Sequence, residues 1–344
     1  MLLNEQGARQ YGGGARGCRR LEQPKRSLSG MERTTRREQR KEPAGRILIS
    51  GASGMLGSVL RGALAPRGAA ILQLVRHEPA GREEVHWDPT ASSPLSEPQA
   101  LEGLDAAIHL SGANLAARRW TAQYLREITA SRVDSTRGLA TALAGLKKPP
   151  RSLLVASAVG IYGDRGDEAL EEDSQPGSGF LADLCRAWEE SAAPAVEAGI
   201  RVAHLRFGVV LDRHAGALAR MLPLFRMGLG GRLGSGRQWM SWISLPDLVA
   251  ATLFVLYTPS LSGPINLTSP NPVTNAEFTR ALSQCLRRPA VLPAPAFALR
   301  IALGRMADEA LLSSTRAFPR KLLEAGFRFA HPSIDDALVE LLRS

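Results

Sequence analysis

Apolar and polar positions alternate along this chain in blocks that predict a repeating order of strands and helices. Short apolar runs of the kind that fill buried parallel strands lie at residues 47–49, 69–75, 106–110, 152–156 and 202–207. Helical spacing of apolar residues follows some of them, most clearly over 121–146 and 180–198. This alternation predicts an α/β fold, a Rossmann-type doubly wound parallel sheet with helices on both faces.

The regular alternation of strand and helix patterns ends after Gly208. Residues 221–236 combine many glycines with isolated apolar residues, so we expect a long loop that crosses a cleft. Residues 246–257 predict a helix with proline in its first turn. Thr274 and Glu277 then have the spacing of a capping box, which predicts the start of another helix.

These patterns divide the chain into three segments. Residues 1–45 predict a disordered basic tail, because they hold 11 of the 43 Lys and Arg residues and almost no apolar periodicity. Residues 46–213 predict an NADP-binding Rossmann domain, for reasons given below, and part of 241–268 completes it. Residues 214–344 predict a smaller, mostly helical lobe on the substrate side.

Three interpretations of the tail besides simple disorder stay open. It is Arg-rich like an organelle-targeting peptide, but its five acidic residues argue against that. A basic arm for nucleic acid would carry aromatic residues between its charges. Translation could also begin at Met31, which would leave a short charged leader.

Composition narrows the range of partners. Most of the net charge of +10 lies in the tail, so we do not expect nucleic acid as a partner. Three widely spaced cysteines form no metal or redox pair, which fits a reducing, cytoplasmic location. No apolar run approaches the ~18–20 residues that cross a bilayer, and we expect no membrane partner. The partners that we expect are a small-molecule substrate and, as one option, a second copy of the chain in a homodimer.

The stretch RILISGASGMLG at 46–57 carries the strongest chemical signal. A buried strand is followed by Gly51, Gly54 and Gly57, and then by helical spacing. In dinucleotide-binding folds one such glycine permits a sharp turn, one lets the backbone approach a pyrophosphate, and one lets helix and strand pack closely. The N-terminus of the following helix attracts phosphates. The order of strand, turn and helix therefore predicts a dinucleotide site.

Arg76 indicates which dinucleotide binds. It ends the second predicted strand, 19 residues after Gly57, and the next carboxylate is that of Glu78. At this place an acidic residue accepts a hydrogen bond from the ribose of NAD, whereas an arginine suits the 2′-phosphate of NADP. A solvated arginine at a strand end is the alternative. We favour the first interpretation and predict NADP(H) as the cofactor.

Further segments carry a resemblance to a known family. They are GASGMLGS at 51–58, HLSGANLAARRWT at 109–121, SRVDSTR at 131–137, SAVGIYGDRGDE at 157–168 and LRFGVVLDR at 205–213. On these segments the chain resembles the extended short-chain dehydrogenases/reductases. Within that group it resembles the atypical NAD-dependent epimerase/dehydratase-like proteins of the SDR39U1 type, from about Arg46 to its C-terminus.

The resemblance implies a cofactor pocket at the place that the glycines predict. The residues that would hold the pyrophosphate are Gly51, Ser53, Gly54, Met55 and Leu56, with Gly57 completing the turn. Those that would line the adenine-ribose side are Leu110, Ser111 and Gly112. Glu127 and Arg132 would form a polar pair that faces the cofactor. The alternatives are an ordinary strand-to-helix turn for the second group and a solvated helix face for the pair.

The sequence departs from the family at the catalytic helix. Active members of the wider family carry a tyrosine and, four residues on, a lysine. In FLADLCRAWEE these positions fall on Leu181 and Cys185. Neither can serve, because leucine has no ionisable group and cysteine supplies no fixed positive charge near neutral pH. The hydroxyl position falls on Ser157 or Ala158.

Tyr162 and Ser157 are therefore the catalytic candidates. Tyr162 is a substitute acid or, alternatively, a packing or substrate-orienting residue, because an unassisted tyrosine with a pKa near ~10 is a poor base at neutral pH. Cys185 as a redox nucleophile is the weaker option, since its mid-helix position favours packing. We interpret His109 and His204, in predicted strands, as core or strand-end residues.

Two functions follow from these observations. The first is an NADP(H)-dependent oxidoreductase or epimerase-like enzyme that acts on a small molecule the sequence does not specify. The second is a non-catalytic protein that uses NADP(H) as a sensing or structural ligand, because the glycine turn is present and the tyrosine-lysine pair is not. We favour the first, because the glycine-rich segment 228–236 with Trp239 and Trp242 is typical of a maintained pocket.

Overall fold

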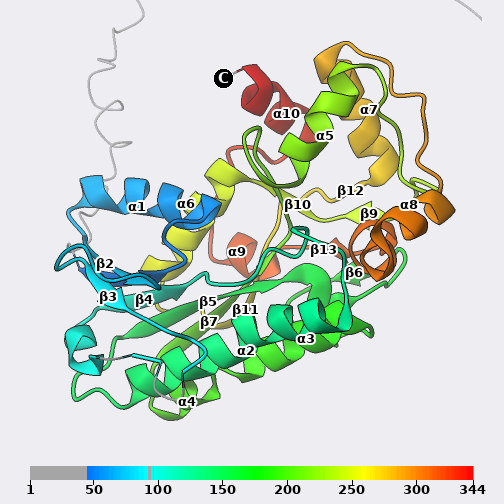
Figure 1. Ribbon diagram of the computed structural model, residues 1–344. Helices are drawn as coiled ribbons and strands as arrows, with labels where there is room; N and C mark the ends of the chain where they lie inside the picture. Colours follow the sequence, from blue (N-terminus) through cyan, green and yellow to red (C-terminus); the bar gives the residue numbers. More distant parts are fainter. Residues whose placement is uncertain (1–44, 92–93, 96, 344) are drawn as a thin grey trace, which may run out of the picture. The chain divides into compact units, whose positions relative to one another are not determined.

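A seven-stranded parallel sheet forms the centre of the computed structural model, which describes residues 45–91, 94–95 and 97–343 (Figure 1). The strands are β1 Arg46–Ser50, β2 Ala70–Val75, β3 Glu84–His86, β4 Ala106–His109, β5 Ser152–Ala158, β7 Arg201–Phe207 and β11 Gly263–Leu267. The predicted tail lies outside the described residues, apart from Gly45.

The order of the strands shows how the chain winds. The sheet reads β11-β7-β5-β4-β1-β2-β3, so the chain starts near the middle, moves to one edge and then returns to build the other half. Every pairing within this sheet is parallel. The direction of winding reverses between β1 and β4, and ligands of such sheets bind at the carboxyl edge beside this switch. The predicted fold class is confirmed.

Helices cover both faces of the sheet (Figure 1). Helices α1 Met55–Leu64 and α6 Leu245–Tyr257 pack on one face. Helices α2 Ala122–Ala144, α3 Phe180–Glu190 and α4 Ala193–Glu197 pack on the other. Successive side chains of β1 alternate between the two layers, because Ile47 and Ile49 join the first core and Leu48 joins the second.

Three elements differ from the sequence-based expectation. The polar connection after β2 contains the short edge strand β3. The helix expected over 180–198 ends at Glu190, and a second helix starts at Ala193 with Pro194 in its first turn. The loop expected over 221–236 begins as helix α5, Gly216–Arg226, because Leu222 and its apolar neighbours are buried against the lobe.

The C-terminal lobe packs around the buried side chains of Trp242 and Phe278. Its main helices are α5, α7 Asn275–Leu286 and α10 Ile334–Arg343. Short strand pairs join its segments, namely β8 Val209–Leu211 with β10 Trp242–Ser244 and β9 Trp239–Met240 with β12 Val273–Thr274. The capping box predicted at the start of α7 is present, because Thr274 and Glu277 each accept a hydrogen bond from the backbone N–H of the other.

The chain after α7 returns to the sheet. It forms α8 Ala296–Leu303, a π-helical turn over Ala307–Leu312, β13 Arg316–Ala317 and α9 Arg320–Glu324, and β13 pairs with β6 Ala169–Leu170. In the π-helical turn, the carboxylate of Glu309 accepts hydrogen bonds from the backbone N–H groups of Phe180 and Leu181 at 2.9 and 3.1 Å. The C-terminal segment thus caps α3, the helix that carries the predicted catalytic positions.

The described residues form one compact unit, to which the second half of the chain contributes β11 and α6. None of the described helices is long and apolar enough to cross a membrane.

Candidate functional site

The turn between β1 and α1 leaves no room for side chains at two of its glycines. Gly51 has a φ of +68°, and a Cβ there would lie 3.0 Å from the carbonyl carbon of Leu110. A Cβ on Gly57 would lie 2.3 Å from the carbonyl oxygen of Gly51. Gly51 therefore provides the sharp turn, and Gly57 lets α1 lie directly against it.

The N-terminus of α1 opens at this turn. Gly54 is the N-cap residue and offers no side chain to accept a hydrogen bond from the first turn of the helix. The backbone N–H groups of Met55, Leu56 and Gly57 lie in the first turn of α1. N–H groups in the first turn of a helix have no carbonyl partner within that helix. Ser53 and Gly54 are exposed beside them, whereas the side chain of Leu56 is buried. This arrangement of amides and helix dipole suits an anion such as a pyrophosphate.

Arg76 lies on the same edge of the sheet. It directly follows β2, which pairs with β1, so it stands at the carboxyl end of the neighbouring strand. Its side chain is exposed and has no hydrogen-bonding or ion-pairing partner within the described part of the chain. A free guanidinium at this place is available to a ligand.

The segment after β4 forms the opposite wall of the turn. The backbone N–H of Leu110 donates to the hydroxyl of Ser50 at 3.1 Å, which ties the ends of β4 and β1 together. Ser111 is half-buried and Gly112 is exposed. A Cβ on Gly112 would lie 3.2 Å from the guanidinium carbon of Arg132, so this glycine makes space for the arginine.

Arg132 places a positive charge beneath this segment. It is only 9% exposed, and its guanidinium donates to the carbonyl oxygens of Ala113 at 3.0 Å and Ile128 at 3.3 Å. The guanidinium also lies 5.1 Å from the ring centroid of Trp188. Burial lowers the pKa of Arg132, and no carboxylate among the described residues pairs with it. The cation is therefore held in place but not neutralised.

Glu127 does not contribute to this arrangement. It is exposed on α2 and forms an ion pair with Arg118 rather than with Arg132. The two side chains of the expected polar pair are thus separate. They stand five residues apart on α2, so Glu127 faces solvent whereas Arg132 lies against Trp188.

Comparison with known proteins identifies the family. The model of the NAD dependent epimerase/dehydratase family matches residues 47–267, from β1 to the end of β11. The chain belongs to this family. A second model, described as a domain of unknown function (DUF1731), matches residues 294–341, which include α8, the π-helical turn and most of α10.

Individual relatives support the narrower resemblance. Epimerase family protein ML0860 of Mycobacterium leprae is 46% identical over 85% of this chain and 94% of its own length. Epimerase family protein SDR39U1 of Bos taurus is 35% identical over 86% of this chain and 99% of its own length. The crystal structure of human SDR39U1 with NADPH superimposes with a TM-score of 0.80 at 32% identity, and covers 87% of this chain and 99% of that one. The resemblance to SDR39U1-type proteins is confirmed.

In this epimerase-family protein, Leu181 and Cys185 lie one turn apart on α3. Both face the turn Val159–Tyr162 that follows β5, because a Cβ on Gly160 would lie 3.4 Å from the Cβ of Leu181 and 3.9 Å from the sulfur of Cys185. Burial raises the pKa of the Cys185 thiol to about 12, so it is not a thiolate near neutral pH. This environment argues against Cys185 as a redox nucleophile.

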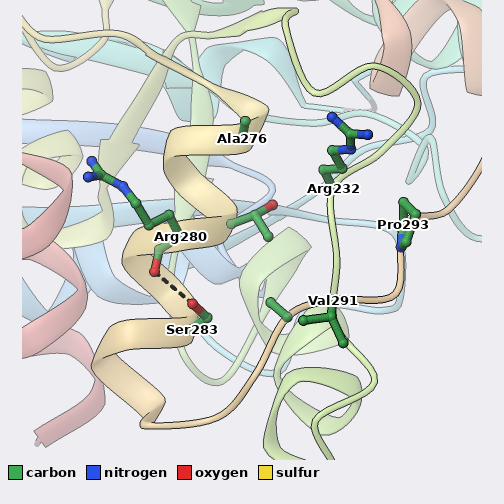
Figure 2. A pocket seen from close by; sticks show the side chains of 8 residues that line it. Arg232, Ala276, Arg280, Ser283, Val291 and Pro293 are labelled. Carbon is green, nitrogen blue, oxygen red and sulfur yellow. Dashed lines mark hydrogen bonds between the residues drawn. The ribbon is translucent and has the colours of Figure 1, made fainter.

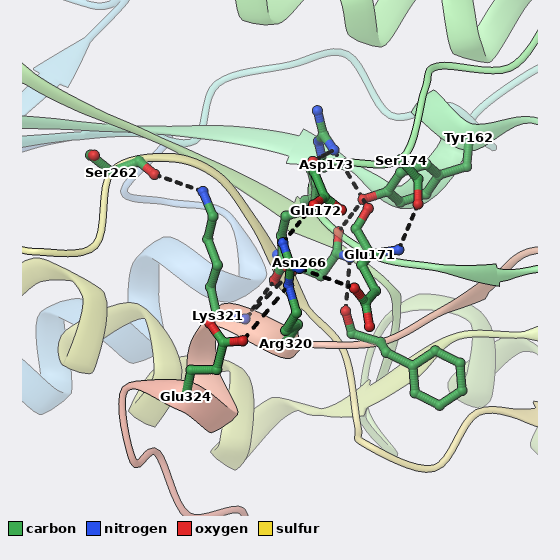
Figure 3. A network of polar contacts seen from close by, with 12 residues as sticks. Tyr162, Glu171, Glu172, Asp173, Ser174, Ser262, Asn266, Arg320, Lys321 and Glu324 are labelled. Carbon is green, nitrogen blue, oxygen red and sulfur yellow. Dashed lines mark hydrogen bonds and ion pairs between the residues drawn. The ribbon is translucent and has the colours of Figure 1, made fainter.

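Tyr162 lies in a buried polar network rather than at a solvent-accessible site (Figure 3). Its hydroxyl lies 2.8 Å from the amide oxygen of Asn266 and 2.9 Å from the carbonyl oxygen of Glu171. The guanidinium of Arg206 donates to it at 2.9 Å. Burial raises the pKa of Tyr162, and the charge of Arg206 only partly opposes this.

This arrangement favours the packing role that the sequence left open for Tyr162 over the catalytic one. The residue is fully buried, and its oxygen is surrounded by three protein partners. A hydroxyl in such a position stabilises the fold but cannot deliver a proton to a ligand without breaking the network. We therefore do not assign it as a catalytic acid.

Ser157 is held by the same buried cluster. It is 2% exposed, and its hydroxyl donates to the carboxylate of Glu189 at 2.7 Å. That carboxylate also accepts two hydrogen bonds from Arg206, at 2.8 and 2.9 Å. Burial alone would lower the pKa of Arg206, but the hydrogen bonds and charge of Glu189 raise it. The geometry thus favours a structural role for Ser157 over the predicted catalytic one.

Three members of the buried network, Arg206, Glu189 and Asn266, are not among the site residues predicted from the sequence. Arg206 occurs within the apolar run of β7, and a charged residue inside a buried strand signals a buried partner. Nothing in the sequence indicates that the partner is Glu189, 17 residues earlier, or that Asn266 of β11 completes the network.

His109 lies beneath the glycine turn and is fully buried, as expected for a core residue. Its Nδ1 is 2.6 Å from the hydroxyl of Ser50 and its Nε2 is 3.2 Å from that of Ser135. It therefore links β1, β4 and α2 at the edge where the cofactor would bind. Burial lowers its pKa to about 4.

We predict a pH dependence of stability from His109. As the pH falls from about 6.5 to about 4, the unfolded chain takes up a proton at this imidazole that the folded protein excludes, so the free energy of unfolding falls by about 1.4 kcal/mol per pH unit. Urea unfolding of the wild type and of His109→Asn, over this pH range, measures the difference. The exposed His77→Asn variant is the control and should match the wild type. Parallel pH profiles for all three proteins would contradict the prediction.

A second prediction separates structural from catalytic roles for Tyr162. Tyr162→Phe leaves Asn266 and Arg206 each short of a buried partner, so we expect a loss of about 1–3 kcal/mol in the free energy of unfolding. Affinity for NADPH, measured by titration under conditions where the variant is folded, should stay within about twofold of the wild type. Unchanged stability together with abolished turnover would restore the catalytic assignment.

Proposed function

We propose that this protein binds NADP(H) at the carboxyl edge of its sheet. The observation that carries the proposal is the cradle at the β1–α1 turn, where Gly51 and Gly57 admit no side chain and the N-terminus of α1 is open. The human relative SDR39U1, which has this fold, was solved with NADPH. The residues around the turn fit the cofactor.

The proposed roles follow from position. The backbone N–H groups of the first turn of α1, with Ser53 and Gly54, would hold the pyrophosphate. Arg76 would pair with the 2′-phosphate, since its guanidinium is exposed and unpaired among the described residues. Leu110, Ser111 and Gly112 would line the adenine-ribose side, as the end of β4 adjoins β1.

The reaction that we propose is oxidation or reduction of a small molecule, in the oxidoreductase or epimerase-like class. The nicotinamide would supply or accept the hydride. The family's lysine would contribute a positive charge, and Cys185 at its position cannot. Arg132 is near enough for its charge to act on the Cys185 thiol, where it opposes the rise in pKa.

Arg132 therefore offers a replacement cation from a different helix. A guanidinium held by two backbone carbonyls can stabilise the negative charge that develops on a carbonyl oxygen during reduction. The proton would then come from water, because the buried hydroxyls of Tyr162 and Ser157 are engaged within the protein.

A specific observation also supports the alternative of a non-catalytic, NADP(H)-sensing protein. The positions of the catalytic pair hold an aliphatic side chain and a buried thiol, and the predicted substitute acid is fully buried. This candidate predicts NADPH binding without hydride transfer to any carbonyl compound.

The cofactor assignment is tested by titration with NADPH and NADH. We expect Arg76→Ala to weaken NADPH binding about tenfold or more, through loss of the 2′-phosphate contact, and to leave NADH binding nearly unchanged. Arg67→Ala is the matched control, because it removes an exposed arginine after α1 at the other end of the helix from the turn. Equal affinity for both cofactors in the wild type would exclude the role of Arg76. Absence of binding to either would exclude the site.

The role of Arg132 is tested by NADPH consumption over a panel of aldehydes and ketones. We expect Arg132→Gln to lower the turnover number about 100-fold and Arg132→Lys, which keeps the charge, to lower it less. NADPH affinity should change less than about threefold in both, because the pyrophosphate site lies on α1. Full turnover in the Gln variant would contradict this role. Tight NADPH binding with no turnover of any compound by the wild type would favour the sensing protein.

A further inference from the structure

The C-terminal lobe exposes a group of apolar side chains that fills no core. This apolar patch consists of Met227, Leu229, Val291, Leu292, Phe297 and Ile301. Phe297 and Ile301 lie one turn apart on α8 and are 66% and 70% exposed. None of the eight residues of α8 is buried. An apolar helix of this kind is expected to contact something outside the chain.

The segments that carry the patch lie side by side. The backbone N–H of Leu292 donates to the carbonyl of Gly230 at 3.2 Å, and that of Ala294 donates to the carbonyl of Arg232 at 2.9 Å. Helix α8 begins two residues after Ala294, and a Cβ on Gly234 would lie 3.8 Å from the Cβ of Ala296. The segment after α5, the connection after α7 and the start of α8 therefore run side by side (Figure 1).

The stretch of chain that carries the patch is strongly one-sided in charge. Residues 214–305 contain nine arginines, all exposed, against one Asp and one Glu, and that Asp is buried. Two of these arginines pair with acids of the π-helical turn, and the other seven form no ion pair among the described residues. The unpaired arginines nearest to the patch in the sequence are Arg226, Arg232, Arg287 and Arg288.

A basic cavity opens beside the patch (Figure 2). It has a volume of about 470 Å³ and lies between α7 and the two neighbouring segments. Arg232 and Arg280 line it together with the side chains of Thr279 and Ser283, and Val291 of the patch forms part of its wall. The Ser283 hydroxyl donates to the backbone carbonyl of Arg280 at 2.9 Å, and one N–H of Arg232 donates to that of Ser235 at 3.3 Å. The Arg280 guanidinium points away from Arg232 (Figure 2), so the remaining N–H groups of Arg232 are the donors that suit a phosphate group at the cavity.

We propose that this face docks on an anionic lipid bilayer. Phe297, Ile301 and the other patch side chains would enter the interface, while the arginines meet lipid phosphates and the cavity receives a headgroup. This is peripheral contact, so it needs no membrane-spanning helix, and it revises the expectation that the protein has no membrane partner. The proposal is independent of the cofactor site.

Charge and shape favour a bilayer over other occupants. A second copy of the chain on this face would bring the unpaired arginines of both copies together, which is repulsive. Nucleic acid would leave the apolar side chains of the patch without a partner. A bilayer with anionic headgroups satisfies the protruding apolar side chains and the surrounding arginines at once.

Co-sedimentation of the full chain with lipid vesicles tests the proposal. We expect the protein to sediment with vesicles of phosphatidylcholine mixed with about one-third phosphatidylglycerol, to stay in solution with pure phosphatidylcholine, and to dissociate as salt is raised. The double variant Phe297→Ser/Ile301→Ser should bind about tenfold more weakly, as should Arg232→Ser/Arg280→Ser.

The matched control variants carry the same kinds of substitution, apolar to Ser and Arg to Ser, at exposed positions outside the patch and the cavity. Val196→Ser/Leu323→Ser removes two exposed apolar side chains outside the patch, and Arg67→Ser/Arg82→Ser removes two exposed arginines of the Rossmann layer. Both should bind like the wild type. The basic tail is present in all of these proteins, so equal binding of every variant would assign the contact to the tail and overturn the proposal.

Two further outcomes would also overturn it. If no vesicle binds and inorganic phosphate alone raises the melting temperature, the cavity holds a free anion. If gel filtration shows a dimer that Phe297→Ser/Ile301→Ser dissociates, the patch is an interface between copies of this chain.

Discussion

The contact between the β1 turn and the start of α1 constrains the whole cofactor edge. At Gly57 the helix lies so close to Gly51 that only a hydrogen atom fits between them. This contact sets the direction in which α1 leaves the sheet, and with it the place where the amides of its first turn converge. The ends of β4 and β2, which carry Leu110 and Arg76, are positioned relative to this turn by their pairing with β1.

A buried ion pair constrains the side chains at the carboxyl ends of β5 and β7 in the same way. Arg206 and Glu189 are almost fully buried, and breaking such a pair by removing one partner costs about 3–5 kcal/mol. The pair binds the hydroxyls of Ser157 and Tyr162, so both hydroxyls are held within the same buried network.

Charge is also distributed unevenly between the two halves of the molecule. In the Rossmann half, acidic and basic side chains are interspersed and several form ion pairs. In residues 214–305 of the lobe, nine exposed arginines accompany the exposed apolar side chains, against one exposed acid. The lobe therefore presents a face whose chemistry differs from that of the cofactor edge, and the two surfaces can bind different partners.

The sequence by itself determined most strands of the central sheet, the glycine turn and the place of Arg76, because these depend on local periodicity and on spacing within one βαβ unit. The capping box of α7 was predictable for the same reason, because it depends on two residues only three positions apart, Thr274 and Glu277. The resemblance further predicted that the tyrosine and lysine positions of the wider family fall on Leu181 and Cys185.

Only the tertiary structure decided what the remaining polar residues do. Tyr162 meets Asn266 across 104 residues, Arg132 meets Trp188 across 56, and both pairings follow from how distant elements pack. The same holds for the exposed face of α8, whose apolar spacing reads like that of any buried helix. Burial and long-range contacts are properties of the packed chain, and no local pattern of residues specifies them.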